Sequence, residues 1–158
     1  MKLNCDLGES FGAWKMGLDD DVMPHIDMAN IACGFHAGDA DVMANTLVLA
    51  KQHNVQIGAH PSYPDKQGFG RRSMVLSEKE LTNCLHYQIA AIEGMAKVQG
   101  LTLCYVKPHG ALYNDMMAND KILQTVINAI ASYPIDLKLM ILATKNANKH
   151  IQIAKSSG

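Results

Sequence analysis

Residues 101–114 read Leu-Thr-Leu-Cys-Tyr-Val-Lys-Pro-His-Gly-Ala-Leu-Tyr-Asn. The first six are apolar and partly β-branched, as in a buried strand, and the run stops at a Lys-Pro-His-Gly cluster that is typical of a loop. The same arrangement occurs twice earlier: residues 28–33 lead into a loop that contains His36, and residues 55–59 lead directly into His60. Three apolar runs thus each end at a histidine, which indicates buried strands that surface into polar loops.

Strand and helix patterns alternate along the chain. Apolar runs predict strands over residues 2–7, 28–33, 55–59, 101–106 and 137–142. Helical spacing of apolar residues predicts helices from Asp39 to about 52, from a Ser77-to-Glu80 capping box to Gly100, and over 120–131 and 146–154. The acidic run 19–21 is typical of a helix N-terminus. Repeated strand-helix-strand units favour parallel pairing, so we predict an α/β fold with one domain over residues 1–158.

Composition narrows the class of protein. The chain has 158 residues and 48% hydrophobic content, enough for one globular domain with a sizeable core. Its formal charge of −1 offers no basic patch for nucleic acid, so a small-molecule partner fits better. No signal peptide or membrane-length apolar run occurs, which predicts a cytoplasmic protein without a membrane partner. The four cysteines show no CxxC or zinc spacing, and we interpret them as reduced core residues.

Several side chains that carry chemistry follow the predicted strands. In a parallel sheet the carboxyl ends of all strands lie at one edge, where the sites of such folds collect. The residues predicted to meet there, and our candidate catalytic residues, are Asp6, Glu9, His36, His60, Lys107 and His109. Imidazoles can move protons, a carboxylate can act as base, and a lysine can stabilise an anion. We therefore expect at least two of the three histidines to line one site.

Each of these assignments has a structural alternative. A single histidine at a strand end is often only a hydrogen-bonded structural group, and we assign His25, His53, His86 and His150 that way. Asp6 with two strand-end histidines matches an Asp-His-His set for a divalent metal ion, but a metal-free hydrogen-bonded network explains the same residues. Arg71 and Arg72 either clamp an anion or are solvated on a surface loop. The glycines match neither a P-loop nor a GxGxxG pattern.

Four long blocks of the sequence together resemble the LamB/YcsF family, which forms the A subunit of the bacterial ATP-dependent 5-oxoprolinase. The blocks are residues 4–14, 29–39, 58–72 and 106–114. The resemblance implies a parallel (β/α) barrel-like fold of the glycoside hydrolase and deacetylase type, and partners in 5-oxoprolinase subunits B and C. It also implies the reaction, in which the lactam of 5-oxo-L-proline opens to L-glutamate with hydrolysis of ATP as cosubstrate.

The chemistry of this reaction suggests, as a hypothesis, roles for side chains within the matched blocks. The residues expected to bind substrate are Asn4, Asn30, Arg71, Arg72 and Tyr113. Lys107 is expected to stabilise an anion, Asp6 or Glu9 to act as base, and the three histidines to shuttle protons. We assign no residue to a metal, although a divalent ion stays an open alternative.

The length of the chain departs from the family pattern. Members of the family continue well past residue 158, and a closed barrel typically takes about 250 residues. We therefore expect a C-terminally truncated barrel whose uncovered edge favours a homo-oligomer, low stability or pairing with a missing companion segment. Two rival functions stay open: a metal-dependent amide hydrolase or deacetylase that uses Asp6, His36 and His60 on a divalent ion, and a non-catalytic subunit that serves only in binding or assembly.

Overall fold

The structure, a computed structural model, describes residues 1–145 and 147–157. The strands are β1 (Asn4–Leu7), β2 (Met28–Ala32), β3 (Gln56–His60), β4 (Leu103–Val106) and β5 (Lys138–Leu139). The helices are α1 (Asp19–Val22), the 3-10 helix η1 (Met23–His25), α2 (Ala40–Gln52), α3 (Glu78–Val98), α4 (Gly110–Ala118), α5 (Asp120–Ala131) and α6 (Ala147–Ser156). Strands and helices thus alternate, as the sequence predicts.

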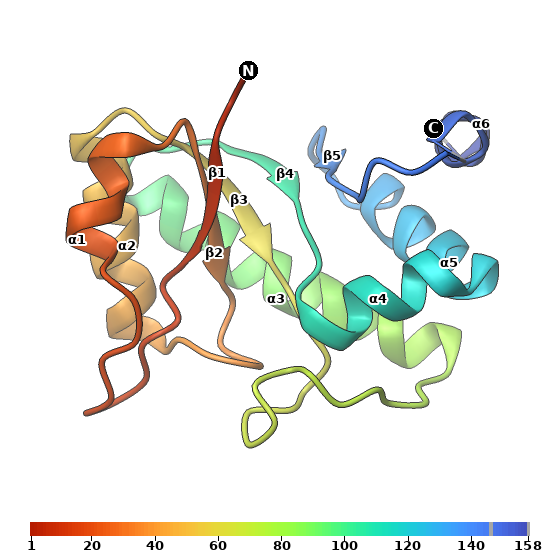
Figure 1. Cartoon of the computed structure of the whole chain (residues 1–158), viewed down its shortest axis with the longest axis horizontal. Coiled ribbons are helices and arrows are strands. Elements are labelled where there is room, and N and C mark those ends of the chain that lie inside the picture. The colour runs from red at the N-terminus through yellow and green to blue at the C-terminus, as the bar shows by residue number, and fades with distance from the viewer. Residues whose placement is uncertain (146, 158) are drawn as a thin grey trace.

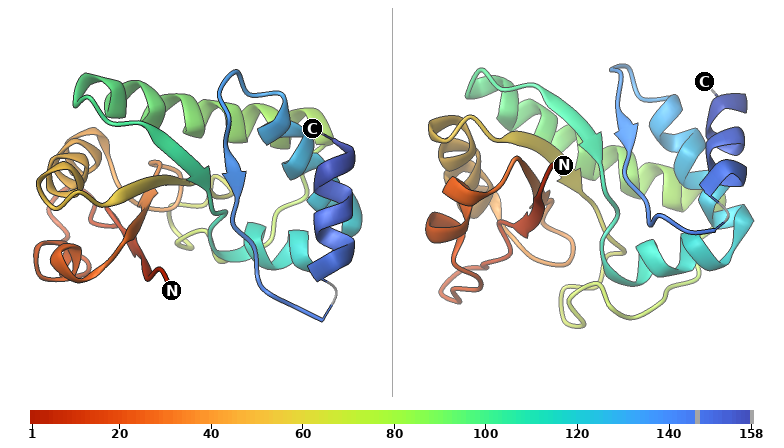
Figure 2. Two further views of the ribbon diagram at one scale, coloured as in Figure 1. Left: turned by 90° about the horizontal axis from the view of Figure 1, so that it is seen from above. Right: turned by 45° about the horizontal axis from the view of Figure 1, so that its top comes forward.

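The strands of the described residues form one parallel sheet in the order β1-β2-β3-β4-β5. Helices α2 and α3 pack against β2, β3 and β4, and α5 packs against α3, α4 and α6. Figure 2 shows α1 and α6 at opposite ends of the molecule. The strands run toward one edge of the sheet, where the loop of residues 61–77 also lies (Figure 1). Strands that are consecutive in the sequence are therefore adjacent in the sheet, as in the wall of a parallel barrel.

The two faces of the sheet differ in chemistry. One row of register partners, Leu7, Ile31, Ala59 and Val106, is buried and apolar. The adjacent row, Asp6, Asn30, Gly58 and Tyr105, carries polar groups. Because successive residues of a strand point to opposite faces, helices cover the first row and the second row lies on the other face. A polar face of this kind can position a functional site.

The predicted helix starts are confirmed. The Asp39 carboxylate accepts a hydrogen bond from the Val42 amide at 2.9 Å and caps α2. Ser77 and Glu80 form the predicted capping box of α3. The predicted start of the last helix, Asn146, lies outside the described residues, and the rest of that helix is present as α6.

One helix was not predicted, and several boundaries differ from the predictions, among them that of β4, which starts at Leu103 and not at residue 101. Helix α4 follows His109 directly and was not predicted, because a Pro-His-Gly sequence is typical of a loop. An amide in the first turn of α4 finds its hydrogen-bond acceptor in a distant segment, since the Ala111 amide donates to the Gly70 carbonyl at 2.8 Å. Strand β5 has two residues instead of the six expected over 137–142, because β4 pairs with it only at Tyr105 and Val106. The first strand starts at Asn4, two residues later than expected.

Two further predictions concern cysteines and membranes. Cys5, Cys33, Cys84 and Cys104 are all free thiols, as expected, but only Cys33 is a buried core residue and the other three are half-buried. Burial raises the pKa of the Cys33 thiol to about 12, so this thiol stays protonated. Across residues 1–145 and 147–157, no helix combines the length and the apolar character that a membrane crossing requires.

Candidate functional site

Asp6 is held by three neighbours at the end of β1. The Asn30 amide donates to Asp6 Oδ1 at 2.7 Å, and the Lys107 ammonium donates to the same oxygen at 2.5 Å. The other oxygen, Oδ2, lies 3.5 Å from His60 Nε2. Burial would raise the pKa of Asp6, but the nearby His60, Lys107 and Asn30 side chains outweigh it and hold the pKa well below its usual range. Asp6 is therefore a fixed anion.

A buried hydrogen-bond chain positions Asp6 from behind. Tyr105 donates its hydroxyl hydrogen to Asn30 Oδ1 at 2.8 Å, and the Asn30 amide nitrogen contacts both Asp6 and Asn4. Gly58 lies between Asn30 and Tyr105 in the row of register partners, and the Tyr105 ring occupies the space that a side chain there would fill. Tyr105 was not among the predicted site residues. Its position two residues before Lys107, on the same face of an extended strand, is the signal that could have revealed it.

The three strand-end histidines are in mutual contact. His60 Nε2 lies 2.9 Å from His109 Nδ1, and the His36 ring stacks on the His109 ring with centroids 3.7 Å apart and planes inclined by 4°. All three residues are at most 5% exposed. Burial lowers the pKa of His36, and burial together with the charges of His36 and His60 lowers the pKa of His109 to about 4. These two imidazoles are therefore neutral near pH 7.

In His60 and His109, one ring nitrogen faces the other histidine (the inner nitrogen), and the second ring nitrogen (the outer nitrogen) contacts a main-chain carbonyl. His60 Nδ1 donates to the Lys107 carbonyl at 2.6 Å, and His109 Nε2 donates to the Phe69 carbonyl at 2.9 Å. A carbonyl oxygen only accepts, so both outer nitrogens carry the hydrogen. Phe69 has a φ of 55°, in the left-handed region that a side chain rarely adopts. The loop thus holds backbone strain where it presents this carbonyl to His109.

Glu9 reaches the same cluster from the loop after β1. Its Oε1 atom lies 3.2 Å from His36 Nε2 and 3.6 Å from His109 Nδ1. Each of Glu9, His36, His60 and His109 offers one atom of a type that binds metals, and these atoms all lie within 4.8 Å of one another. The set differs from the predicted Asp-His-His set, because Glu9 and His109 take the place of Asp6. The oxygen Oδ1 of Asp6 is already engaged by Asn30 and Lys107.

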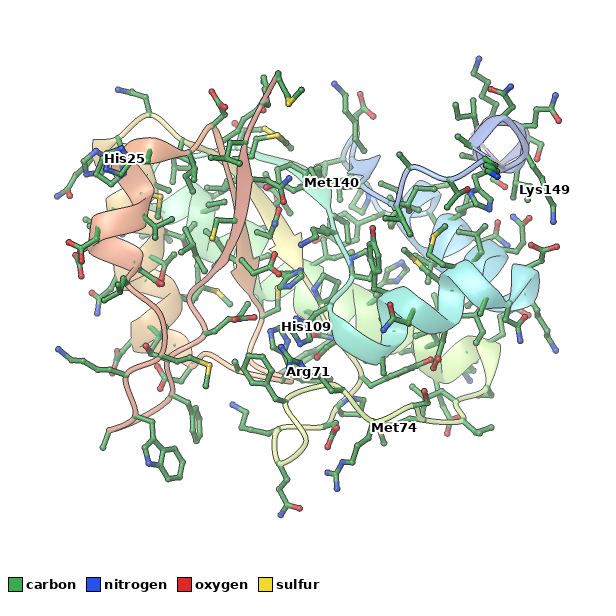
Figure 3. All side chains as sticks on the ribbon, in the orientation of Figure 1. His25, Arg71, Met74, His109, Met140 and Lys149 are labelled. Carbon is green, nitrogen blue, oxygen red and sulfur yellow. The ribbon has the colours of Figure 1, made fainter. Side chains whose placement is uncertain are left out.

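The other predicted substrate-binding residues, Tyr113, Arg71 and Arg72, differ in burial and in the groups that they contact. Tyr113 is half-buried, and burial with the negative charge of Asp6 raises its pKa. Arg71 is exposed, and its guanidinium lies over the Phe69 ring, 5.3 Å from the centroid. Figure 3 shows Arg71 beside His109. Arg72 instead pairs with Asp65 of its own loop, Nε lying 2.9 Å from Oδ1.

All six candidate catalytic residues therefore belong to one contact network, which Asn30 joins through Asp6 and Asn4 joins through Asn30. The histidines assigned to other roles lie on other elements: His25 in η1, His53 after α2, His86 in α3 and His150 in α6. Figure 3 places His25 far from His109. His86 contacts a neighbouring helix, with Nε2 at 2.7 Å from the Ala129 carbonyl.

Comparison with known proteins identifies the family. The model of the LamB/YcsF family matches residues 1–158. The chain belongs to the LamB/YcsF family. Among relatives of this LamB/YcsF chain, a Pseudomonas putida protein named as a 5-oxoprolinase A subunit is 61% identical over 142 residues, which cover 90% of this chain. A Vibrio parahaemolyticus protein, also named as a 5-oxoprolinase A subunit, is 55% identical over 154 residues, or 98% of this chain.

A solved structure supports the fold of this LamB/YcsF chain. The crystal structure of a lactam utilization protein from Thermus thermophilus superposes with a TM-score of 0.93 and 39% sequence identity, covering 99% of this chain. The predicted α/β, barrel-like fold is thereby confirmed. The chain spans 55% of the Pseudomonas relative, 61% of the Vibrio relative and 62% of the Thermus chain.

Proposed function

We propose that this chain is the lactam-opening part of an ATP-dependent 5-oxoprolinase, acting with subunits B and C on 5-oxo-L-proline to form L-glutamate. The names of the relatives support a lactam-related role in an assembly of several subunits. The observation that carries the proposal is the single network of Asp6, Lys107 and three buried histidines at the strand ends. Because the reaction consumes ATP, we place it in the cytoplasm.

The chemistry explains why these groups suit a lactam. A five-membered lactam is a stable amide, so its oxygen first attacks the γ-phosphorus of ATP, and ADP leaves. Water then adds to the activated ring carbon, and the carbon–nitrogen bond breaks as the nitrogen gains a proton. A second water releases phosphate from the resulting acyl phosphate and leaves glutamate. The site must therefore supply a cation for phosphate charge, a base for water and a proton donor for nitrogen.

The network supplies each of these groups. We assign the Lys107 ammonium to the developing negative charge, because it is a cationic group at the end of β4 that is partly exposed to an approaching anion. We assign proton transfer to the imidazoles and the base to Glu9 or Asp6. We assign Tyr113 and the exposed Arg71 to binding of the substrate carboxylate, with Asn4 and Arg72 as further candidates. Asn30 is fully buried, so we assign it to positioning Asp6.

A reconstituted assay tests this proposal. The chain is combined with candidate B and C subunits, 5-oxo-L-proline and ATP, and glutamate is measured. Lys107→Met keeps most of the side-chain length but removes the charge, and we expect it to abolish most turnover. Lys138→Met removes an exposed lysine of β5 and is the matched control. Full turnover by a folded Lys107→Met protein contradicts the proposed role.

A second candidate function is hydrolysis of an amide without ATP, helped by a metal ion. The cluster of Glu9, His36, His60 and His109 is the observation that favours it. An assay without ATP and without the companion subunits, but with a divalent metal ion, distinguishes the two candidate functions. Release of glutamate under those conditions favours the metal-dependent hydrolase, and strict dependence on ATP favours the oxoprolinase.

A further inference from the structure

The inner nitrogens of His60 and His109 face each other without a hydrogen between them when both rings are neutral. Each outer nitrogen donates to a main-chain carbonyl, so the hydrogen of each neutral ring is already used. The inner atoms, His60 Nε2 and His109 Nδ1, lie 2.9 Å apart. Two lone pairs at that separation repel, and a bound cation removes the repulsion. Two nitrogens that bind one tetrahedral Zn²⁺ ion at about 2.1 Å lie about 3.4 Å apart, so the two rings need to separate by only about 0.5 Å to hold it.

Negative charge surrounds this pair of nitrogens. Glu9 Oε1 lies 3.6 Å from His109 Nδ1, and Asp6 Oδ2 lies 3.5 Å from His60 Nε2. The Glu9 side chain is 16% exposed and that of Asp6 is 38% exposed, whereas the histidine side chains are at most 7% exposed. A small cation can therefore approach from the carboxylate side, while the rings are enclosed from behind.

The surroundings of His60 and His109 match those of metal ligands. Metal-binding histidines usually donate their second N–H to a carbonyl or carboxylate, which fixes the tautomer. The loop that holds His109 is packed so tightly that a Cβ atom at Gly70 would lie 2.8 Å from His36 Cβ and 2.9 Å from His109 Cδ2. The strained Phe69 carbonyl and the bare backbone at Gly70 together hold the ring in one orientation.

We propose that Glu9, His36, His60 and His109 bind one divalent transition-metal ion of the Zn²⁺ class. Three imidazoles and one carboxylate suit zinc and its first-row neighbours better than the hard cations Mg²⁺ and Ca²⁺, which prefer oxygen ligands. The binding of the metal ion is inferred from the geometry alone. A role for that ion in lactam opening rests on the proposed function. In that reaction the ion would supply a Lewis acid, and Asp6, which lies outside the ligand set, would stay ionised and hold the Lys107 ammonium in place.

The ligands should differ in importance. Within the described residues, the only hydrogen-bond contact of the His36 ring is with Glu9, and His36 Nδ1 has no partner. Parallel stacked rings direct their lone pairs along parallel lines, so His36 and His109 must tilt apart to share an ion. His36 is thus less preorganised than the two carbonyl-anchored rings, and its loss should weaken binding less.

Calorimetric titration of the purified 158-residue chain with Zn²⁺, and with Mg²⁺ in comparison, tests the inference. We expect one Zn²⁺ per chain and no comparable Mg²⁺ binding. His60→Gln and His109→Gln should each weaken Zn²⁺ binding by at least about 100-fold, at or beyond the upper end of the range for loss of an outer-shell partner, and His36→Gln by less. His25→Gln removes an exposed, distant histidine and should leave binding unchanged.

Titration of Glu9→Gln distinguishes a lost metal ligand from a misfolded variant, and the reconstituted assay distinguishes metal binding from lactam turnover. If a histidine variant fails to fold, Glu9→Gln serves instead, because Glu9 is at the open side, and we expect it to weaken Zn²⁺ binding at least about 10-fold. The absence of stoichiometric Zn²⁺ binding by the folded wild type overturns the inference and leaves a shared proton between the rings. Equal affinity in wild type and Glu9→Gln also overturns it. Zn²⁺ binding without lactam turnover in the reconstituted assay refutes only the proposed function.

Discussion

Replacing Gly58 with alanine should disrupt the chain that positions Asp6. A Cβ atom at this position would overlap the Cδ2, Cε2 and Cζ atoms of the Tyr105 ring. The ring is 2% exposed and packed across β3, so it must move as a unit to relieve the overlap. That movement separates the Tyr105 hydroxyl from Asn30 Oδ1, which it now contacts at 2.8 Å.

The expected cost follows from three contributions. Overpacking a core typically costs about 1–3 kcal/mol. Losing the Tyr105 hydrogen bond leaves the fully buried Asn30 acceptor unpaired, which costs about 1–3 kcal/mol more. Removing a glycine restricts the unfolded chain and returns roughly 0.4–1 kcal/mol. Gly58→Ala should therefore destabilise the protein by about 2–4 kcal/mol.

Urea unfolding monitored by circular dichroism measures this cost, and Tyr105→Phe provides the test of mechanism. In the wild type, Tyr105→Phe should cost about 1–3 kcal/mol, because it leaves Asn30 unpaired. In the Gly58→Ala background the hydrogen bond is already broken, so the same change should cost under about 0.5 kcal/mol. Gly94→Ala is the matched control: no atom lies within 4 Å of its added Cβ, and it should stabilise α3 by about 0.5–1 kcal/mol. Equal effects of Tyr105→Phe in both backgrounds refute the reasoning.

Three other predictions concern stability. Ser77→Ala removes the capping box of α3 and should cost about 1 kcal/mol in urea unfolding, whereas an effect near zero would mean the cap is unimportant. Leu85→Ala empties a fully buried position of α3 and should lower the free energy of unfolding by about 2–5 kcal/mol, and a loss below about 1 kcal/mol would contradict the packing. Arg72 holds the pKa of Asp65 at about 2, below its unfolded value of about 3.9, so this pair contributes stability above about pH 4 that is lost as pH falls toward 2. Asp65→Asn should flatten that part of the pH profile of urea midpoints, and an unchanged profile would exclude the pair as its cause.

Local sequence patterns predicted much of the fold because local rules govern those parts. The side chains of Asp39, Ser77 and Glu80 satisfy amides within their own helices, so the helix starts are visible in short segments. The parallel order of strands, once assumed, brings His36, His60 and His109 to one edge without further information. The convergence of five of the six candidate catalytic residues, all except Glu9, therefore needed only the sheet topology.

Long-range contacts account for what the sequence did not reveal. Helix α4 lacks a side-chain cap, and its first turn depends on the Gly70 carbonyl about 40 residues earlier. The role of Tyr105 depends on Gly58, a residue of a neighbouring strand that only the register places beneath the ring. Glu9 approaches His36 and His109 through a loop whose path no periodicity encodes. In each case the deciding partner is distant in sequence.

The backbone of the loop after β3 sets the orientation of the histidine cluster as much as the strands do. The strands deliver His60 and His109 to the same edge, but two neutral imidazoles could adopt several tautomers there. The carbonyls of Lys107 and Phe69 remove that freedom, and the Phe69 carbonyl is available only because Phe69 adopts a positive φ. Gly110 lets the loop approach, since a Cβ at that position would collide with the Gly70 carbonyl. Bare backbone at Gly70 and Gly110 is thus a condition for the inward-facing lone pairs, and the chemistry of the site depends on two residues that have no side chain.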